Sequence, residues 1–378
     1  MLPETCLRHA SRPVVIAVFT ATALVALWLT WLALFGTAVL PPNVGAPEPP
    51  GAVGDLATYR RIVEAMRGGE GYYEAAHAAL LEGGYGTLSV FNWRTPLNAW
   101  LLAALPSLNW GLALGVGLAV VATLLAYRLV RDSAGPLFAG VGLLALLVSL
   151  ANLGSADAML FSDITAGTLI LLSVVAYGLR LAGPGFVAGA LALFLRELAG
   201  VYVVVCLVLA IRQRRWAEVG GWLVVLAAYA GYFLWHAQMV AAQLGPLDRA
   251  YPDSWLAFGG GEFLLATGAF NGLVKLLPLW VTALLLPLGL LGLTARPAGL
   301  RAAATAFAYA ALFLVAGKSY NSYWGALYTP LLMLGLPWAA AAIRDGLAVL
   351  RRSRSSSAAP AGVPRSGSSP PSAGGSVR

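Results

Sequence analysis

Long apolar runs separated by short polar connections make up most of this chain, from Val14 to Leu350. Several of these runs reach about 17–25 residues, the length that an α-helix needs to cross the hydrocarbon core of a bilayer. The pattern therefore predicts an all-α polytopic membrane protein. Eight spans are expected, near residues 14–40, 108–130, 136–152, 160–181, 217–240, 271–294, 299–317 and 323–347.

The apolar stretch 185–211 allows two interpretations. A single crossing would put Arg180 and the Arg212–Arg215 cluster on opposite sides of the membrane, although Lys and Arg concentrate in cytoplasmic connections. A short helical hairpin with the arms Phe186–Leu195 and Leu198–Ile211 keeps these arginines on one side. The hairpin is the favoured interpretation, and with its two arms the chain has about ten predicted membrane segments.

The hairpin interpretation also sorts the charged residues between the two faces. Arg196 and Glu197 lie at the tip, below the outer surface, where ionisable side chains need a water-filled cavity or a charged partner. Both termini are expected in the cytoplasm. Only four acidic residues are expected on the cytoplasmic side, namely Glu4, Asp132, Glu218 and Asp345.

Composition fits a membrane location. Hydrophobic residues make up 59% of the chain and charged residues 11%, whereas soluble domains carry roughly 25% charged residues. The net charge of +8 is spread over short connections, so nucleic acid is not an expected partner.

Residues 1–354 are predicted to form one integral membrane domain. The Ser-, Pro- and Gly-rich residues 355–378 are predicted to be a disordered cytoplasmic tail.

The first apolar run and the two cysteines concern processing and redox chemistry. The first apolar run, Val14 to about Leu40, is too long for the apolar part of a signal peptide, so we expect it to stay as an anchor. Cys6 and Cys206 cannot form a disulfide framework, and neither is assigned any chemistry.

Three connections are expected on the outer face. The first, residues 41–107, should contain an amphipathic helix that begins at Asp55 and lies at the membrane surface. The second is residues 241–270, and the third, Gly317–Tyr323, is short and polar. The apolar positions of the amphipathic helix follow helical spacing: Leu56, Tyr59, Ile62, Val63 and Met66.

The first connection carries candidate functional residues. Asp55 would serve as the N-cap of its helix, as a general base, or as both. Arg94 stands in a Trp-Arg-Thr-Pro turn, where it would be an interfacial anchor beside Trp93 or the partner of a phosphate, which suits its forked donors. Tyr59 is a candidate substrate contact.

Further candidates lie near other outer ends. Arg196 and Glu197 form either a structural pair or a functional one, because ionisable residues inside a membrane are functional candidates. Asp157 and Asp163 would bind a metal or a sugar, or Asp157 would cap a helix; their spacing does not place both on one helical face. The last outer turn offers amide, hydroxyl and aromatic groups suited to a sugar, at Lys318, Tyr320, Asn321 and Tyr323.

Metal and nucleotide signatures are weak. His9, His77 and His236 lack metal-ligand spacing, so no cofactor is expected, although a divalent metal stays open. The Gly259-Gly-Gly run has no following Lys-Ser/Thr, which disfavours a nucleotide-binding P-loop and with it a nucleotide-sugar donor.

Short motifs carry a family resemblance. Asp55 early in a long first outer connection, Gly71-Tyr-Tyr73 and Phe91-Asn-Trp-Arg-Thr-Pro96 resemble the polyprenyl-phosphate-sugar-dependent glycosyltransferases of the GT-C superfamily. These include the protein O-mannosyltransferases and the aminoarabinose transferases of lipid A. With the later Tyr320-Asn-Ser-Tyr-Trp-Gly325, the pattern is similar to bacterial membrane proteins of cell-surface glycopolymer formation.

The resemblance implies roles for individual residues. Asp55 takes the position of the superfamily's catalytic base, which is an acid in the first outer connection. Arg196 matches a basic residue near the lipid-phosphate site, with Glu197 as its orienter or as a sugar ligand. Many members carry paired acids in the first connection, whereas Leu56 follows Asp55 here, and a metal-dependent version is therefore less expected.

The sequence thus predicts an inverting glycosyltransferase of the cytoplasmic (inner) membrane, active on the extracytoplasmic face. It would move a sugar from a polyprenyl-phosphate donor to a glycan, lipid or protein acceptor, with Arg94 and Arg196 holding the lipid phosphate. One alternative is a lipid-linked sugar flippase or small-solute transporter, which needs polar residues reaching from face to face. Another is a non-catalytic membrane subunit of a polysaccharide assembly complex.

Overall fold

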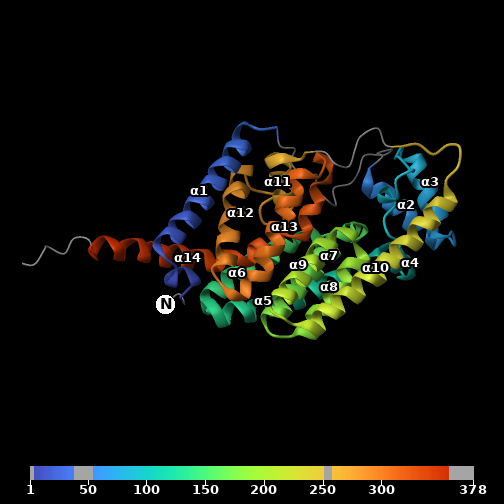
Figure 1. Ribbon diagram of the computed structural model, residues 1–378. Helices are drawn as coiled ribbons and strands as arrows, with labels where there is room; N and C mark the ends of the chain where they lie inside the picture. Colours follow the sequence, from blue (N-terminus) through green and yellow to red (C-terminus); the bar gives the residue numbers. More distant parts are fainter. Residues whose placement is uncertain (1–3, 38–53, 251–257, 357–378) are drawn as a thin grey trace, which may run out of the picture.

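Helices form the regular structure of this protein. The computed structural model describes residues 4–37, 54–250 and 258–356, and in these ranges it contains helices and no strand (Figure 1). The α-helices are α1 (Arg12–Phe35), α2 (Asp55–Arg67), α3 (Tyr72–Glu82), α4 (Leu97–Ala104), α5 (Leu108–Ala134), α6 (Pro136–Ser149), α7 (Ser162–Gly178), α8 (Ala182–Leu195), α9 (Gly200–Arg212), α10 (Trp216–Gln243), α11 (Gly260–Ala269), α12 (Leu279–Thr294), α13 (Leu300–Val315) and α14 (Thr329–Ser356). Short 3₁₀ helices join them: η1 (Cys6–His9), η2 (Val90–Asn92), η3 (Leu150–Leu153), η4 (Ala156–Leu160), η5 (Glu197–Ala199), η6 (Pro297–Gly299) and η7 (Ser319–Leu327).

Six of the described helices are long and apolar enough to cross a membrane. Many of their outward side chains are large and apolar; Leu27 and Phe35 of α1, for example, are 68% and 71% exposed. A helix surface of this kind is suited to contact with lipid, because apolar side chains that face lipid tails are not exposed to water. The chain is therefore a multi-pass membrane protein by the length and composition of its helices. The six are α1, α5, α6 with η3, α10, η6 with α13, and α14.

The predicted count of about ten membrane segments is not confirmed among the described residues. The helices α7, α8 and α12 are apolar but have only 14 to 17 residues, and α9 has 13. The expected span 271–294 includes an irregular stretch before α12, in which the Asn271 side chain donates to Ser149 Oγ (2.6 Å). The expected span 323–347 begins as η7 and becomes an α-helix only at Thr329.

Two predicted connections differ from the structure. The second outer connection, predicted over 241–270, contains the helix α11, whose residues from Phe263 to Ala269 are all buried. Its apolar run is too short for a membrane span, so the pattern of long apolar runs does not predict a helix there. The predicted disordered tail 355–378 lies outside the described residues from 357 onward, as does the expected first span beyond residue 37.

The chain reverses direction between α8 and α9. Arg196 has an extended backbone (φ −148°, ψ 116°) that ends α8, and Ser173 Oγ of α7 contacts both the Gly185 carbonyl and the Tyr202 hydroxyl. In a continuous helix, Gly185 and Tyr202 would lie about 25 Å apart at 1.5 Å per residue. The two helices therefore form a hairpin, with Arg196 and Glu197 at its tip.

Charged residues gather at the end of the helices opposite to this tip. The four acids predicted for the cytoplasmic side each lie near an arginine: Glu4 with Arg8 (3.1 Å), Asp132 with Arg131 (3.4 Å), Glu218 with Arg215 (2.7 Å) and Asp345 with Arg344 (2.6 Å). In Figure 1, α2 and α3 pack together far from the N-terminus, beside the last turns of α10.

The first-connection helix α2 packs on the protein itself. Leu56, Ile62 and Val63 are between 2% and 8% exposed, and they join clusters formed with other helices. The apolar stripe of α2 therefore packs against the protein, and the location of this helix at the membrane surface stays a prediction.

Two glycines hold η7 between α7 and α11. A Cβ at Gly325 would overlap the Thr267 carbonyl of α11, and a Cβ at Gly167 of α7 would overlap the Ala326 carbonyl. Only glycine lets these backbones approach so closely. The position of η7, and of the tyrosine and asparagine that it carries, depends on both contacts.

We expect Gly325→Ala to destabilise the protein by about 1–3 kcal/mol, because the added methyl must displace backbone rather than a flexible side chain. Gly140→Ala is the matched control, since nothing lies within 4 Å of its Cβ position, and it should be neutral or slightly stabilising. Thermal unfolding in detergent measures both. Equal melting temperatures for the two variants would contradict the close packing of η7.

Candidate functional site

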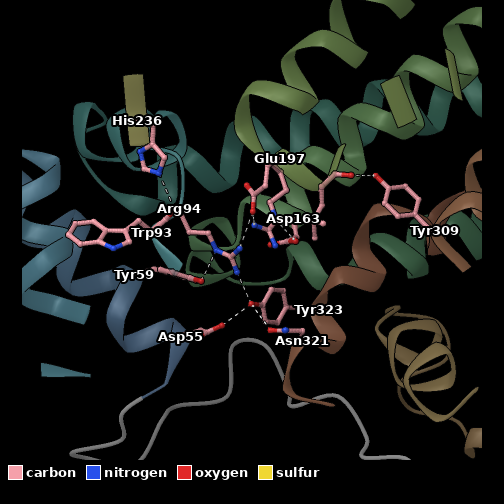
Figure 2. A network of polar contacts seen from close by, with 12 residues as sticks. Asp55, Tyr59, Trp93, Arg94, Asp163, Glu197, His236, Tyr309, Asn321 and Tyr323 are labelled. Carbon is pink, nitrogen blue, oxygen red and sulfur yellow. Dashed lines mark hydrogen bonds and ion pairs between the residues drawn. The ribbon is translucent and has the colours of Figure 1, made fainter. Parts of the chain in front are cut away.

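A network of polar side chains joins segments that lie far apart in the sequence (Figure 2). Two elements of the first connection, the start of α7, the hairpin tip and η7 each contribute. The members are Asp55 and Tyr59 of α2, Arg94 before α4, Asp163 of α7, Arg196 and Glu197 of the hairpin tip, and Asn321 and Tyr323 of η7.

Asp55 receives two phenol hydrogen bonds. The Tyr85 hydroxyl donates to Oδ1 (2.7 Å) and the Tyr323 hydroxyl donates to Oδ2 (2.8 Å). The helix N-cap is Gly54, and it makes no side-chain capping bond. The interpretation of Asp55 as an N-cap is therefore wrong: its carboxylate faces two tyrosines instead of the free N–H groups of its own helix.

Arg94 stands at the centre of the network. Its Nε donates to the Tyr59 hydroxyl (2.8 Å) and its Nη2 to the Tyr323 hydroxyl (2.8 Å), while Nη1 lies 3.4 Å from Glu197 Oε1. The Tyr323 hydroxyl thus accepts from Arg94 and donates to Asp55. Arg94 and Asp55 are linked through one phenol oxygen.

The side chain of Arg196 is almost completely buried. Its side chain is 1% exposed, Nε donates to Asp163 Oδ1 (2.7 Å), and Nη1 contacts Glu197 Oε1. Leaving either acid without its cation would be costly at this depth. Tyr309 donates to the Leu198 carbonyl (2.9 Å) next to the tip, which fixes the backbone that carries Arg196.

The charges of the inner network balance. Arg94 and Arg196 are matched by Asp163 and Glu197, and Asp55 adds one negative charge at the outer edge. Three buried polar atoms of the network members have no partner among the described residues: Arg196 Nη2, Glu197 Oε2 and Asn321 Nδ2. Unpaired buried polar atoms are rare, and they mark places where water or a ligand group can bind.

The tyrosines around Asp55 remain protonated. Burial raises the pKa of Tyr59 to about 12, despite the opposing charge of Arg94. Burial also raises the pKa of Tyr323 well above its usual value, where nearby Arg94 opposes the shift and Asp55 adds to it. These phenols therefore remain neutral near neutral pH, and those of Tyr85 and Tyr323 serve as hydrogen-bond donors to Asp55.

Two small cavities lie on either side of Tyr59 and Arg94. The outer one, of about 60 Å³, is lined by Asp55, Tyr85 and Tyr323 among others. The inner one, of about 30 Å³, is lined by Asp163 and by apolar residues of α2 and α4. A water molecule needs about 10–15 Å³ by this measure, so each cavity holds a few waters in the described arrangement.

The structure brings most of the predicted site residues together. Asp55, Tyr59, Arg94, Arg196, Glu197, Asn321 and Tyr323 lie in the network. Tyr320 lines the outer cavity, half-exposed, and Lys318 Nζ lies 5.9 Å from the centre of its ring. These two stand at the edge of the network.

Sequence reasoning missed two members of the site. The sequence suggests a metal or a sugar as the partner of Asp163, but its carboxylate pairs with Arg196. Asp157, its proposed companion, pairs with Arg60 (2.6 Å) instead. Tyr85 was not singled out, because a tyrosine after Gly83-Gly84 has no local signal that points to Asp55.

Metal ligands do not cluster in the part of the chain that the structure describes: no group of three or more His, Cys, Asp or Glu side chains there could hold an ion. His77 instead contacts Asp248 (2.9 Å), and His236 contacts the Tyr73 hydroxyl (3.0 Å).

A comparison of the chain with protein-family models, with curated proteins and with solved structures found no match. The character of the protein is therefore inferred from its own fold and site. Its described residues form helices, six of them candidate membrane spans, and hold a charge-balanced network with one further carboxylate beside a small cavity.

We expect Arg196→Met to destabilise the protein by about 3–5 kcal/mol, because Asp163 would remain buried without a cation. Adding Asp163→Asn should recover part of this loss by removing the stranded charge. Arg60→Met is the matched control; its ion pair with Asp157 is largely exposed and should matter by at most about 1 kcal/mol.

Thermal unfolding of the purified variants in one detergent compares all three changes. A loss for Arg196→Met no larger than that of Arg60→Met would contradict the structural role of the buried pair. No recovery on adding Asp163→Asn would contradict the assignment of that role to Asp163.

Proposed function

We propose that the protein is an inverting glycosyltransferase that moves a sugar from a polyprenyl-phosphate donor to an extracytoplasmic acceptor in cell-surface glycan or glycopolymer formation. The observation that carries this proposal is the shared outer cavity. A half-buried carboxylate, Asp55, and a guanidinium, Arg94, line the same cavity and are linked through Tyr323. A base and an anion-binding cation side by side are what such a transfer needs.

Asp55 is the proposed general base. An acceptor hydroxyl in the outer cavity gives its proton to the carboxylate while its oxygen bonds to the anomeric carbon of the sugar. The bond between that carbon and the phosphate oxygen breaks, and its electron pair leaves with the lipid phosphate. A single displacement from the opposite side inverts the anomeric configuration.

Arg94 is the proposed partner of the phosphate. Its side chain is 19% exposed and lines both cavities. A guanidinium has five N–H donors, and three of its nitrogens already contact Tyr59, Tyr323 and Glu197. Each Nη has a second N–H, so two donors are left for the oxygens of the leaving phosphate.

Arg196 has a different proposed role from the one expected from the sequence. Its side chain is too deeply buried to meet a phosphate in this arrangement, at 1% exposure. It contacts Glu197, which in turn lies against Arg94. We therefore assign Arg196 to positioning Glu197 and Arg94, and leave the phosphate to Arg94.

The proposed location follows from the sidedness of charge. The arginine-rich end, which includes the pairs of Glu4, Glu218 and Asp345, is placed in the cytoplasm together with both termini. The cavity of Asp55 then faces the outside of the cytoplasmic membrane. Polyprenyl-linked donors are available there, whereas nucleotide sugars are confined to the cytoplasm.

We expect Asp55→Asn to lower sugar transfer by about 10²–10⁴-fold, the usual contribution of a general base. The assay offers radiolabelled polyprenyl-phosphate sugar and an envelope acceptor fraction to purified protein in liposomes. Asp157→Asn is the matched control: this acid belongs to an ion pair with Arg60 that is separate from the outer cavity, and its loss should leave transfer unchanged.

Three outcomes separate the alternatives. Transfer that depends on Asp55 supports the enzyme. Movement of labelled lipid between leaflets without transfer identifies a flippase, and neither activity, with normal protein levels, leaves a non-catalytic subunit. Full transfer by Asp55→Asn would show that this carboxylate is not the base.

A further inference from the structure

The turn that follows α3 carries several side chains of the outer cavity. We call residues 83–94 the α3–α4 turn; it holds Tyr85, Phe91 and Arg94. Its first residues close α3 in a defined way. Gly84 has φ +71°, the Gly84 N–H donates to the Leu81 carbonyl (3.0 Å), and the Tyr85 N–H donates to the Leu80 carbonyl (2.9 Å). This is a glycine helix stop that fixes the direction in which the chain leaves α3.

A second segment holds the same turn from the other side. Arg249, which follows α10, accepts backbone hydrogen bonds from Thr87 (2.9 Å) and Leu88 (3.3 Å). Its guanidinium Nη2 donates to the Gly84 carbonyl (3.1 Å). Arg249 therefore contacts the turn on both sides of Tyr85, by its backbone and by its side chain.

Asp248 fixes the segment that carries Arg249. Its side chain is 1% exposed; Oδ1 accepts from His77 Nε2 of α3 (2.9 Å), and Oδ2 accepts from the Gly245 N–H (2.5 Å). The His77 ring stacks on Trp93 with centroids 5.5 Å apart. One carboxylate thus joins α3, the end of the α3–α4 turn and the segment after α10.

We propose that Tyr85 is a positioning residue for Asp55. We also propose that Asp248, which lies outside the cavity, holds Tyr85 in position. This inference rests on the proposed function. The N-cap of α2 is Gly54 and not Asp55, and the phenols of Tyr85 and Tyr323 donate to the two oxygens of the Asp55 carboxylate, which determines how the carboxylate is turned. Tyr323 is fixed by η7 and Arg94. Tyr85 is fixed by the α3–α4 turn, and the turn is fixed through Asp248 and Arg249.

This arrangement gives the base a second, remote support. A general base must be held within hydrogen-bond reach of the proton that it takes, and small displacements cost large factors in rate. Removing the Tyr85 hydroxyl leaves Asp55 with the hydrogen bond from Tyr323 and frees its carboxylate to rotate, while Asp55 and Arg94 themselves stay in the outer cavity. Loosening Asp248 shifts Tyr85 and has the same consequence by a longer route.

The first experiment compares Tyr85→Phe with Tyr127→Phe in the transfer assay. Tyr127 lines a different cavity, between α5, α6 and α14, so its variant should keep full activity. Loss of one hydrogen bond to a carboxylate should lower kcat about 10- to 100-fold for Tyr85→Phe. KM for the polyprenyl-phosphate sugar should not change, because Arg94, the proposed partner of the phosphate, is held by Tyr59, Glu197 and Tyr323. An unchanged kcat, or a change confined to KM, would overturn the role of Tyr85.

The second experiment is a double-mutant cycle between Tyr85→Phe and Asp248→Asn. An asparagine has one acceptor oxygen, so it cannot satisfy both His77 and the Gly245 N–H as Asp248 does. If Asp248 acts through Tyr85, the double variant should lose no more activity than Tyr85→Phe alone. Additive losses would overturn the proposed route from Asp248.

Hydrogen exchange of the α3–α4 turn gives a readout that needs no activity. Asp248→Asn should raise exchange at Thr87 and Leu88, whose N–H groups donate to Arg249, while Tyr85→Phe should leave it unchanged. Unchanged exchange in Asp248→Asn would overturn the structural part of the inference. Absence of transfer by the wild-type protein, with the exchange result as expected, would instead refute the proposed function alone.

Discussion

The buried ion pair between Arg196 and Asp163 is the interaction on which the site depends. Both side chains are 1% exposed, and they join the hairpin tip to the first turn of α7. Burying two charges this completely carries a desolvation cost, which their attraction offsets only with good geometry and further hydrogen bonds. Glu197 and Arg94 extend the pair into a network of two cations and two anions. The first connection, which supplies Arg94, is thereby held against the hairpin.

This dependence explains how residues from remote segments reach one cavity. Arg94 contacts Tyr59 through Nε and Tyr323 through Nη2, and Tyr323 is placed by η7 between two glycine contacts. Asp55 then finds its partners on other elements instead of on its own helix. Its orientation is a property of the assembled fold, not of α2.

The sequence allowed the membrane character, the turn-back at Arg196 and most members of the site to be predicted, because apolar run length and the sidedness of arginine are local signals. The number of spans could not be read in this way. Apolar runs such as those of α7 and α12 look like spans, yet irregular or 3₁₀ turns precede both helices. Partners that depend on packing were also hidden. Asp163 pairs with Arg196 only because the hairpin lies against α7, and Tyr85 meets Asp55 only after the α3–α4 turn has closed.

The small size of the two cavities limits how a substrate can enter. Both are lined by Tyr59 and Arg94, and under the proposed function a sugar phosphate would need more room, so one of these two side chains would have to move. The Arg196 side is held by fully buried charges and by Tyr309. On the outer side, α2 is tied at its far turns by a partly exposed pair, Arg60 with Asp157, and by Arg67 to the Leu102 carbonyl. Exposed pairs contribute little to stability, so under the proposed function α2 is the side expected to move. Because Asp55 and Tyr59 lie one turn apart on this helix, the two side chains would then move together, and the proposed base would regain its hydrogen bond from Tyr323 only when α2 closes again on Arg94.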